Sequence, residues 1–288
     1  MMKKTLQYLA PLVSIAVLAV SSWWLQSGAS RNVEKKQATK EQIAPSPMAD
    51  FIVACLGGFR SLATEVVWFR LERLQSEGRY AELAQLGAWL TFLEPHTPEV
   101  WAYTAWNLSY NVSVMMSTPS DRWRWVESGL RLLRDDGLRM NPNSPELCRE
   151  IAWLYLLKIS IDTDSASYYY REKWREQVEE IEKSGNWTSL MMLPNVMKDL
   201  EKEYGKLDWK ESSTAALYWA CYGLMQKPSG LVEMNLMQVK FQSLMQMSKK
   251  DARFAPLTLK EMKRFGKQYP SQSIKNLIKF FAERNCLN

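Results

Sequence analysis

The chain has 288 residues, of which 47% are hydrophobic and 24% are charged, and Gly and Pro contribute 12 residues each. This composition excludes an intrinsically disordered or low-complexity protein, and the length allows one extended domain or two small ones. The single histidine excludes a metal site with several histidine ligands. The net charge is +6, but the chain contains no recognisable nucleic-acid-binding motif, so we expect no nucleic acid partner.

An apolar, uncharged run at residues 8–25 sets the N-terminus apart. It is at the short limit for a membrane-spanning helix and long for the core of a signal peptide, and Trp23 and Trp24 suit the headgroup region of a bilayer. We therefore predict a transmembrane anchor or signal segment over residues 1–29, with a single N-terminal helix that holds a soluble, extracytoplasmic domain at the membrane. The small residues at 27–29 leave open the alternative that the segment is cleaved and the protein exported.

Beyond a polar linker at residues 30–50, helical stretches alternate with short breaks. Apolar residues recur every three or four positions, as at Leu83, Leu86 and Leu90, which is typical of amphipathic helices. No stretch alternates apolar and polar residues for long enough to predict a sheet, so we predict an all-α fold. The expected helices cover residues 51–76, 80–93, 99–115, 121–140, a stretch from 145 onward, 167–183, 193–204, 211–225, 231–248, 258–267 and 271–284.

Two of these helices begin with residues typical of helix caps. Ser144 is expected to cap the helix that follows it, with Pro145 at the first helical position and Glu146 near the positive end of the helix dipole. Asp121 is expected to cap the helix at residues 121–140.

Residues 51–185 contain an imperfect internal repeat. A first unit of 34 residues starts at Thr64 and has Pro95 as its closing proline. A second unit starts at Pro98 and is longer, and a third starts at Pro145. Each unit contains two helical stretches, so the repeating element is a helical hairpin.

This repeat resembles the tetratricopeptide repeat, although Leu71 replaces a small residue, Arg134 stands where an aromatic residue is usual, and the third unit lacks its closing proline. The resemblance implies antiparallel helical hairpins that stack as a short solenoid, with the first helix of each hairpin lining a concave groove for a partner peptide or helix. The residues that it places in this groove are Glu65, Trp68, Glu72, Trp106, Tyr110, Arg149 and Trp153.

General packing of helical hairpins is the alternative for this region, and the same aromatic side chains would then be covered by residues 51–69 or by the C-terminal third. The chain also contains the motifs Gly57-Gly58-Phe59-Arg60, Trp101 to Asn111, Arg122-Trp123-Arg124-Trp125 and Leu207-Asp208-Trp209. In these motifs it is similar to an uncharacterised bacterial repeat-protein family found in planctomycete and verrucomicrobial genomes. That resemblance implies no known activity.

Residues 186–288 are predicted to form a basic C-terminal helical extension, because the chain from residue 184 onward has 16 Lys and Arg against nine Asp and Glu. Its last stretch, from Ser271 to Asn285, is amphipathic, with Ile274 on its apolar face and Lys275 on its polar face. Either this helix packs back on the domain, or it binds an anionic membrane surface.

The cysteines and the short acidic motif are interpreted as structural. Cys55, Cys148 and Cys221 lie in apolar helical stretches and are expected in the core. Asp162-Thr163-Asp164 starts like a calcium-binding loop but lacks the required glycine, so we expect a helix N-terminal cap there.

Two further pairs of side chains have more than one interpretation. Asn107 and Asn111 share a helix face and either contact a ligand backbone or tie down the loop that follows them. Trp123 and Trp125 lie about 200° apart on a helix, so one is expected in the core and the other is expected to face outward.

No catalytic, metal or cofactor site is expected, because the chain has no recognisable nucleophile–base set, P-loop or dinucleotide-binding motif. The sequence therefore predicts a non-enzymatic scaffold of the bacterial cell envelope that binds partner proteins and contacts the membrane through residues 8–25. One alternative is a protein that binds or remodels membrane surfaces with its basic C-terminal helices. Another is a hydrolase or transferase with an unrecognised carboxylate site, for which Glu72, Asp135 and Asp136 are candidates.

Overall fold

The computed structural model describes residues 60–285, which are all-helical with no strand among them, so the all-α prediction is confirmed. The predicted anchor at 1–29, the linker at 30–50 and the start of the predicted helix at 51–76 lie outside the described residues, as does Cys55. None of the described helices is both long enough and apolar enough to span a membrane.

Most helices begin and end close to their predicted positions. The clearest difference is α13, which begins at Phe254 and not at the predicted residue 258. Proline is tolerated in the first turn of a helix, where its missing N–H costs no helical hydrogen bond, so the helix can begin before Pro256. In chain order the elements are α3 (Arg60–Ser76), α4 (Tyr80–Leu93), α5 (Pro98–Trp106), η2 (Asn107–Val112), η3 (Ser113–Met115), α6 (Pro119–Arg131), η4 (Leu132–Gly137), α7 (Leu138–Met140), α8 (Pro145–Trp153), η5 (Leu154–Ser160), α9 (Ser167–Ser184), η6 (Trp187–Leu190), α10 (Pro194–Tyr204), α11 (Ser212–Met225), α12 (Gly230–Ser248), α13 (Phe254–Gln268) and α14 (Gln272–Arg284).

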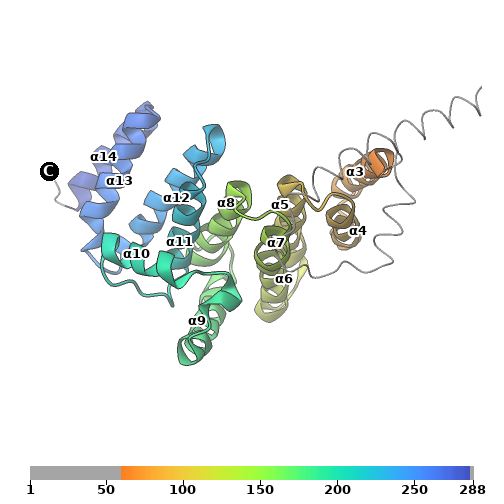
Figure 1. Cartoon of the computed structure of the whole chain (residues 1–288), viewed down its shortest axis with the longest axis horizontal. Helices are drawn as coiled ribbons and strands as arrows, with labels where there is room; N and C mark the ends of the chain where they lie inside the picture. The colour runs from red at the N-terminus through yellow and green to blue at the C-terminus, as the bar shows by residue number, and fades with distance from the viewer. Residues whose placement is uncertain (1–59, 286–288) are drawn as a thin grey trace, which may run out of the picture. The chain divides into compact units, whose positions relative to one another are not determined.

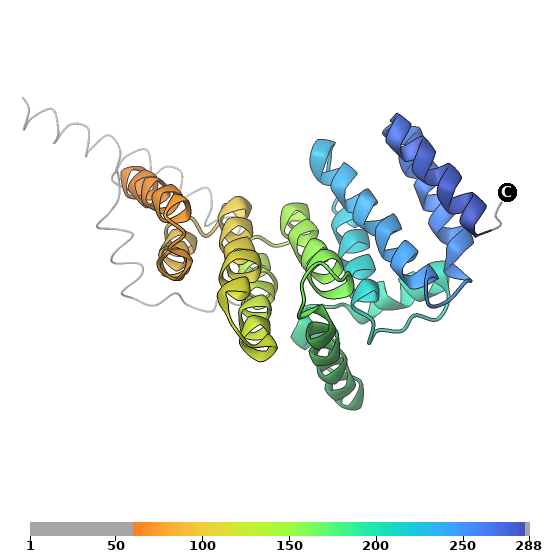
Figure 2. The same cartoon turned by 180° about the vertical axis from the view of Figure 1, so that it is seen from behind.

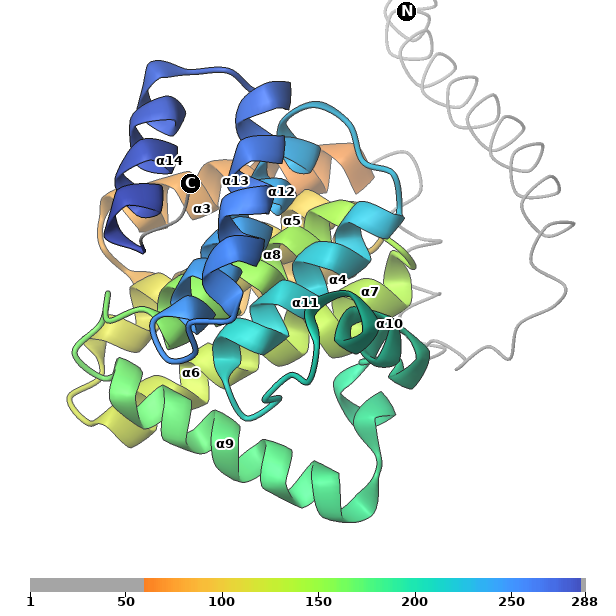
Figure 3. The ribbon, with the colours of Figure 1, turned by 90° about the vertical axis from the view of Figure 1, so that its left-hand side faces the viewer.

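The described residues divide into two units at Arg70/Leu71, and α4 to α14 belong to the second. In this second unit helices pack side by side, α4 with α5, α8 with α11, α11 with α12, α12 with α13 and α13 with α14 (Figures 1 and 2). Helix α9 packs against η5 and α6, away from α13 and α14 (Figure 3). The main buried core runs from Trp101 to Phe254, so it includes residues on both sides of the predicted boundary at 185/186.

Three long helices contain a π-helical segment, which the sequence patterns did not predict. Segment η2 continues α5, η4 continues α6 and η5 continues α8. The last backbone hydrogen bond of η5 runs from the N–H of Ile161 to the carbonyl of Leu156, five residues earlier, at 3.0 Å. Each π segment widens its helix locally and rotates the side chains that follow, and such segments are frequent at functional sites.

The two predicted caps have different outcomes. The Ser144 hydroxyl accepts the backbone N–H of Leu147 at 3.3 Å and Pro145 holds the first position of α8, which confirms the first prediction. The prediction for Asp121 is wrong, because the cap of α6 is Thr118, whose hydroxyl accepts the N–H of Asp121 at 3.1 Å. Pro119 suits the first helical position, so the helix starts two residues before Asp121.

Helices α5 and α6 approach each other closely at Gly129. A Cβ at this position would lie 2.1 Å from the hydroxyl of Ser109 and 2.9 Å from the carbonyl oxygen of Ala105. Because the second of these atoms belongs to the backbone, only glycine allows the two helices to pack at this distance.

Several predicted core residues are buried. Cys148 and Cys221 are buried free thiols, as expected. Trp123 is buried and packs against Tyr170, with ring centroids 5.9 Å apart, whereas Trp125 is only half-buried. The two tryptophans therefore differ in burial, as their angular separation predicts.

Candidate functional site

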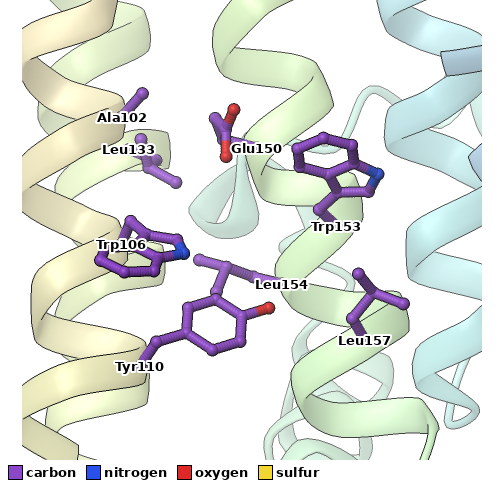
Figure 4. Close-up of a pocket in the computed structure, with 8 residues that line it drawn as sticks. All are labelled: Ala102, Trp106, Tyr110, Leu133, Glu150, Trp153, Leu154 and Leu157. Carbon is purple, nitrogen blue, oxygen red and sulfur yellow. The ribbon is translucent and has the colours of Figure 1, made fainter. Parts of the chain in front are cut away.

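A pocket of about 250 Å³ lies between the helix formed by α5 and η2 and the helix formed by α8 and η5 (Figure 4). Three aromatic side chains face it, and Glu150 is its one charged lining residue. Each of the three π segments contributes at least one side chain. The lining residues are Ala102, Trp106, Tyr110, Leu133, Glu150, Trp153, Leu154 and Leu157.

Trp106 and Tyr110 form one wall of this pocket. They lie one helical turn apart, and their rings stack with centroids 5.9 Å apart and an interplanar angle of 28°. Trp106 is 41% exposed, which is high for so large an apolar side chain. Burial raises the pKa of Tyr110, so its phenol stays neutral at physiological pH.

Trp153 forms the opposite wall, and a charged pair flanks it. The Arg149 guanidinium lies 5.3 Å from the centroid of the Trp153 ring, within the range of a cation–π interaction. The same guanidinium donates to the Glu150 carboxylate, with Nε and Oε1 3.0 Å apart. The ion pair fixes both side chains at the rim of the pocket beside an aromatic ring.

A buried ion pair supports the wall formed by Tyr110. Lys158 Nζ lies 5.1 Å from the Tyr110 ring centroid and 2.6 Å from Asp164 Oδ2, and the two charged side chains are 3% and 4% exposed. Asp164 also accepts the backbone N–H of Ala166 at 3.0 Å, Arg122 Nη1 at 3.1 Å and the Tyr170 hydroxyl at 3.1 Å.

These contacts correct the interpretation of the segment from Asp162 to Asp164. The N-cap of α9 is Ala166, so Asp164 is not the expected helix cap but the centre of a buried network. Burial alone would raise the pKa of Asp164, but the hydrogen bonds from Lys158 and Ala166 hold this pKa at about 2. In the part of the chain that the structure describes, no group of acidic, histidine or cysteine side chains is arranged to hold a metal ion.

The structure brings together four of the seven predicted groove residues. Trp106, Tyr110 and Trp153 line the pocket and Arg149 contacts Trp153. Glu72 is exposed on α3 and does not line the pocket. Two others, Glu65 and Trp68, belong to the first unit, where Glu65 is exposed and Trp68 is half-buried.

Sequence reasoning missed five lining residues of the pocket. Ala102 could have been predicted from the α-helical period, because it precedes Trp106 by one helical turn on the same face. Leu133, Leu154 and Leu157 lie in π segments, where an α-helical period assigns the wrong face. No sequence pattern distinguishes Glu150 from an ordinary exposed glutamate.

No protein-family model, curated protein or solved structure matches this chain. The resemblance to the tetratricopeptide repeat therefore stays a prediction.

The candidate polar residues outside the pocket are engaged locally or exposed. Asp135 accepts both Nε and Nη2 of Arg134, at 2.6 and 2.9 Å, and Asp136 is exposed. The amide of Asn111 donates to Asn107 Oδ1 at 2.6 Å, and the amide of Asn107 donates to a backbone carbonyl at 2.9 Å. The two asparagines thus bind each other and a backbone carbonyl within their own helix.

Proposed function

We propose that the chain is a non-enzymatic scaffold of the bacterial cell envelope that binds a segment of a partner protein in the pocket between α5–η2 and α8–η5. In this proposal the hairpins within residues 51–185 stack as a short tetratricopeptide-like solenoid, and α5 and α8 are the first helices of consecutive hairpins. The observation that carries the proposal is that Trp106, Tyr110 and Trp153 face one pocket while Trp106 keeps 41% of its surface exposed.

The size of the pocket favours a protein partner over a small metabolite. Pockets that enclose small molecules usually measure about 300–1,000 Å³. This one measures about 250 Å³, which suits one or two side chains that project from a longer peptide or helix. Its lining is apolar except for Glu150, so a large apolar side chain of the partner is the expected anchor.

The pocket also has the composition of an interface hot spot. Tryptophan, tyrosine and arginine are the residue types that most often dominate binding energy at protein interfaces. Here Trp106, Tyr110 and Trp153 line the pocket, and Arg149, which is paired with Glu150, lies over the Trp153 ring. A partner that covers these rings would exclude water from contacts that are already ordered in the free chain.

We expect Trp106→Ala to abolish partner recovery while it lowers the free energy of unfolding by less than the roughly 3–5 kcal/mol that truncation of a fully buried tryptophan costs, because 41% of the side chain is exposed. Loss of a central anchor costs about 2 kcal/mol or more in binding, roughly a thirtyfold loss of affinity. The measurement is affinity purification from native membranes with mass spectrometry, alongside denaturant unfolding of each variant.

Trp89→Ala is the matched control, because Trp89 is 58% exposed on α4 and does not line the pocket. It should leave both partner recovery and stability unchanged. A Trp106→Ala variant that unfolds far more easily than the parent would show that Trp106 is a core residue, and a variant that recovers every parental partner would remove the pocket from the interface.

A second candidate function is binding to an anionic membrane surface through α13 and α14. Seven basic residues lie exposed on these two helices, and Phe280 is 60% exposed among them. Each Lys or Arg near an anionic surface contributes about 1 kcal/mol of attraction. The basic residues are Lys260, Lys263, Arg264, Lys267, Lys275, Lys279 and Arg284.

Vesicle flotation separates this function from membrane attachment through residues 8–25, which we propose as the anchor of an extracytoplasmic domain. The full chain is expected to float with neutral and with anionic vesicles. A chain that lacks residues 1–30 is expected to stay at the bottom with both, because the scaffold proposal needs no second membrane contact. Flotation of the shortened chain with anionic vesicles alone would favour the second candidate function. If the full chain stays at the bottom with both kinds of vesicle, the proposal that residues 8–25 anchor the protein in the membrane is wrong.

A further inference from the structure

Helix α3 is apolar on two opposite faces. On one face Leu71 and Leu74 are 0% and 4% exposed, as is usual for core residues. On the other face Leu62, Val66 and Phe69 are 58%, 66% and 71% exposed. A helix that is apolar all round is normally buried on all sides. A partner that covers the exposed face is therefore expected.

The exposed apolar residues of α3 follow the spacing of a coiled coil. Leu62, Val66 and Phe69 are separated by four and then by three residues, which corresponds to positions d, a and d of a heptad. At about 100° per residue, the three side chains lie within about 60° of one another around the helix axis. In parallel coiled coils, valine at position a with leucine at position d favours two strands. This spacing indicates that a second helix covers the face.

The charged residues beside this face select the orientation of the second helix. Glu65 and Arg70 are both exposed and lie on opposite flanks of the apolar residues, at heptad positions g and e. Among the described residues, neither of them forms an ion pair. In a parallel pair of α3 helices, Glu65 of each copy lies opposite Arg70 of the other copy, which gives two ion pairs related by symmetry.

An antiparallel pair does not have this complementarity. Its two-fold axis brings the flank that carries Glu65 and Glu72 against the same flank of the second copy, so like charges face each other. The acidic flank also makes a poor match for an anionic membrane surface, which attracts helices with basic polar faces. A second copy in the parallel orientation is thus the occupant that both the apolar spacing and the charges favour.

We propose that α3 forms a parallel two-stranded coiled coil with α3 of a second copy of this chain. Leu62, Val66 and Phe69 form its apolar seam, and the pairs between Glu65 and Arg70 flank the seam. Because the seam is short, the dimer is reversible, with a Kd in the micromolar range. The parallel orientation suits two chains held in one membrane, but the proposal depends neither on the predicted anchor nor on the aromatic pocket.

Sedimentation equilibrium of the full chain in density-matched detergent micelles measures this dimer. Val66→Glu places two like charges in the seam and should raise the Kd at least about tenfold. Circular dichroism should show that the monomer keeps its helices, because Val66 is 66% exposed. Val114→Glu is the matched control, since Val114 is 49% exposed on η3, and it should dimerise as the parent does. A parent that stays monomeric throughout the micromolar range, or unchanged dimerisation in Val66→Glu, overturns the proposal.

Charge exchange at two exposed positions tests the parallel orientation without altering the apolar seam. Glu65→Arg and Arg70→Glu each turn both ion pairs into like-charge contacts, so each should weaken dimerisation about tenfold at low salt. The double variant Glu65→Arg with Arg70→Glu restores opposite charges and should recover the parental Kd, and an equal mixture of the two single variants should form heterodimers. A double variant as weak as the single variants, or a single variant that dimerises more tightly than the parent, overturns the proposal.

Discussion

Replacement of Asp164 by Asn is expected to lower the free energy of unfolding by about 3–5 kcal/mol, as is usual when one partner of a buried ion pair is removed. Lys158 and Asp164 are 3% and 4% exposed and lie 2.6 Å apart, so the variant leaves an ammonium group buried without a counter-charge. Arg122 and the Tyr170 hydroxyl also lose a charged acceptor. Urea unfolding of the parent and the variant at neutral pH measures the difference.

The pH dependence of stability gives an independent check on the same group. The folded pKa of Asp164 is about 2, below its ordinary value of 3.8. A depressed folded pKa contributes stability that is present above the unfolded pKa and is lost as the pH falls from 3.8 through 2. The contribution is about 2 kcal/mol, from 1.36 kcal/mol for each pKa unit. Asp164→Asn should lack this part of the acid destabilisation.

A double variant, Lys158→Met with Asp164→Asn, serves as the control for this prediction. It removes the unpaired ammonium group together with its partner, so it should be more stable than Asp164→Asn alone. An Asp164→Asn variant within about 1 kcal/mol of the parent would contradict the buried network that supports Tyr110.

The positions of the helices were predictable because their ends depend on local chemistry. Ser144 and Pro145 define the start of α8 through a side-chain cap and a fixed backbone angle, and Gly185 ends α9 in the left-handed conformation that glycine favours. Thr118 was missed as the cap of α6, because Asp121 has the same capping chemistry three residues later. The π segments were not predictable, since an extra residue in a turn is stabilised by tertiary packing and not by a local sequence signal.

The candidate site was predictable only where its residues share one helix face. Trp106 and Tyr110 are separated by four residues, so an α-helical period places them together, and the structure stacks their rings. Leu133 comes from a different hairpin helix and a π segment, and nothing local links it to Trp106. The buried ion pair between Lys240 on α12 and Glu261 on α13 was not predictable either, because the two residues lie on separate helices and charged residues are usually on the surface.

Trp174→Ala is expected to cost about 3–5 kcal/mol of stability, in contrast to Trp106→Ala, because Trp174 is 1% exposed in the main core. Its ring packs edge-on against Tyr155, with centroids 4.8 Å apart, and Tyr155 is itself 1% exposed. Truncation to Ala therefore opens a cavity between α9 and η5 that rigid neighbours on both sides cannot fill. Urea unfolding of both tryptophan variants under identical conditions measures the contrast.

Trp174→Phe separates packing from polarity at the same position. The indole Nε1 of Trp174 is buried without a hydrogen-bond partner among the described residues, and such a donor is itself destabilising. Phenylalanine removes this donor and keeps an aromatic ring against Tyr155, so Trp174→Phe should retain much more stability than Trp174→Ala. If Trp174→Ala unfolds at nearly the parental urea concentration, α9 does not cover η5 as described. If the Phe variant is as unstable as the Ala variant, the indole N–H makes a hydrogen bond that the core requires, because volume alone then fails to explain the loss.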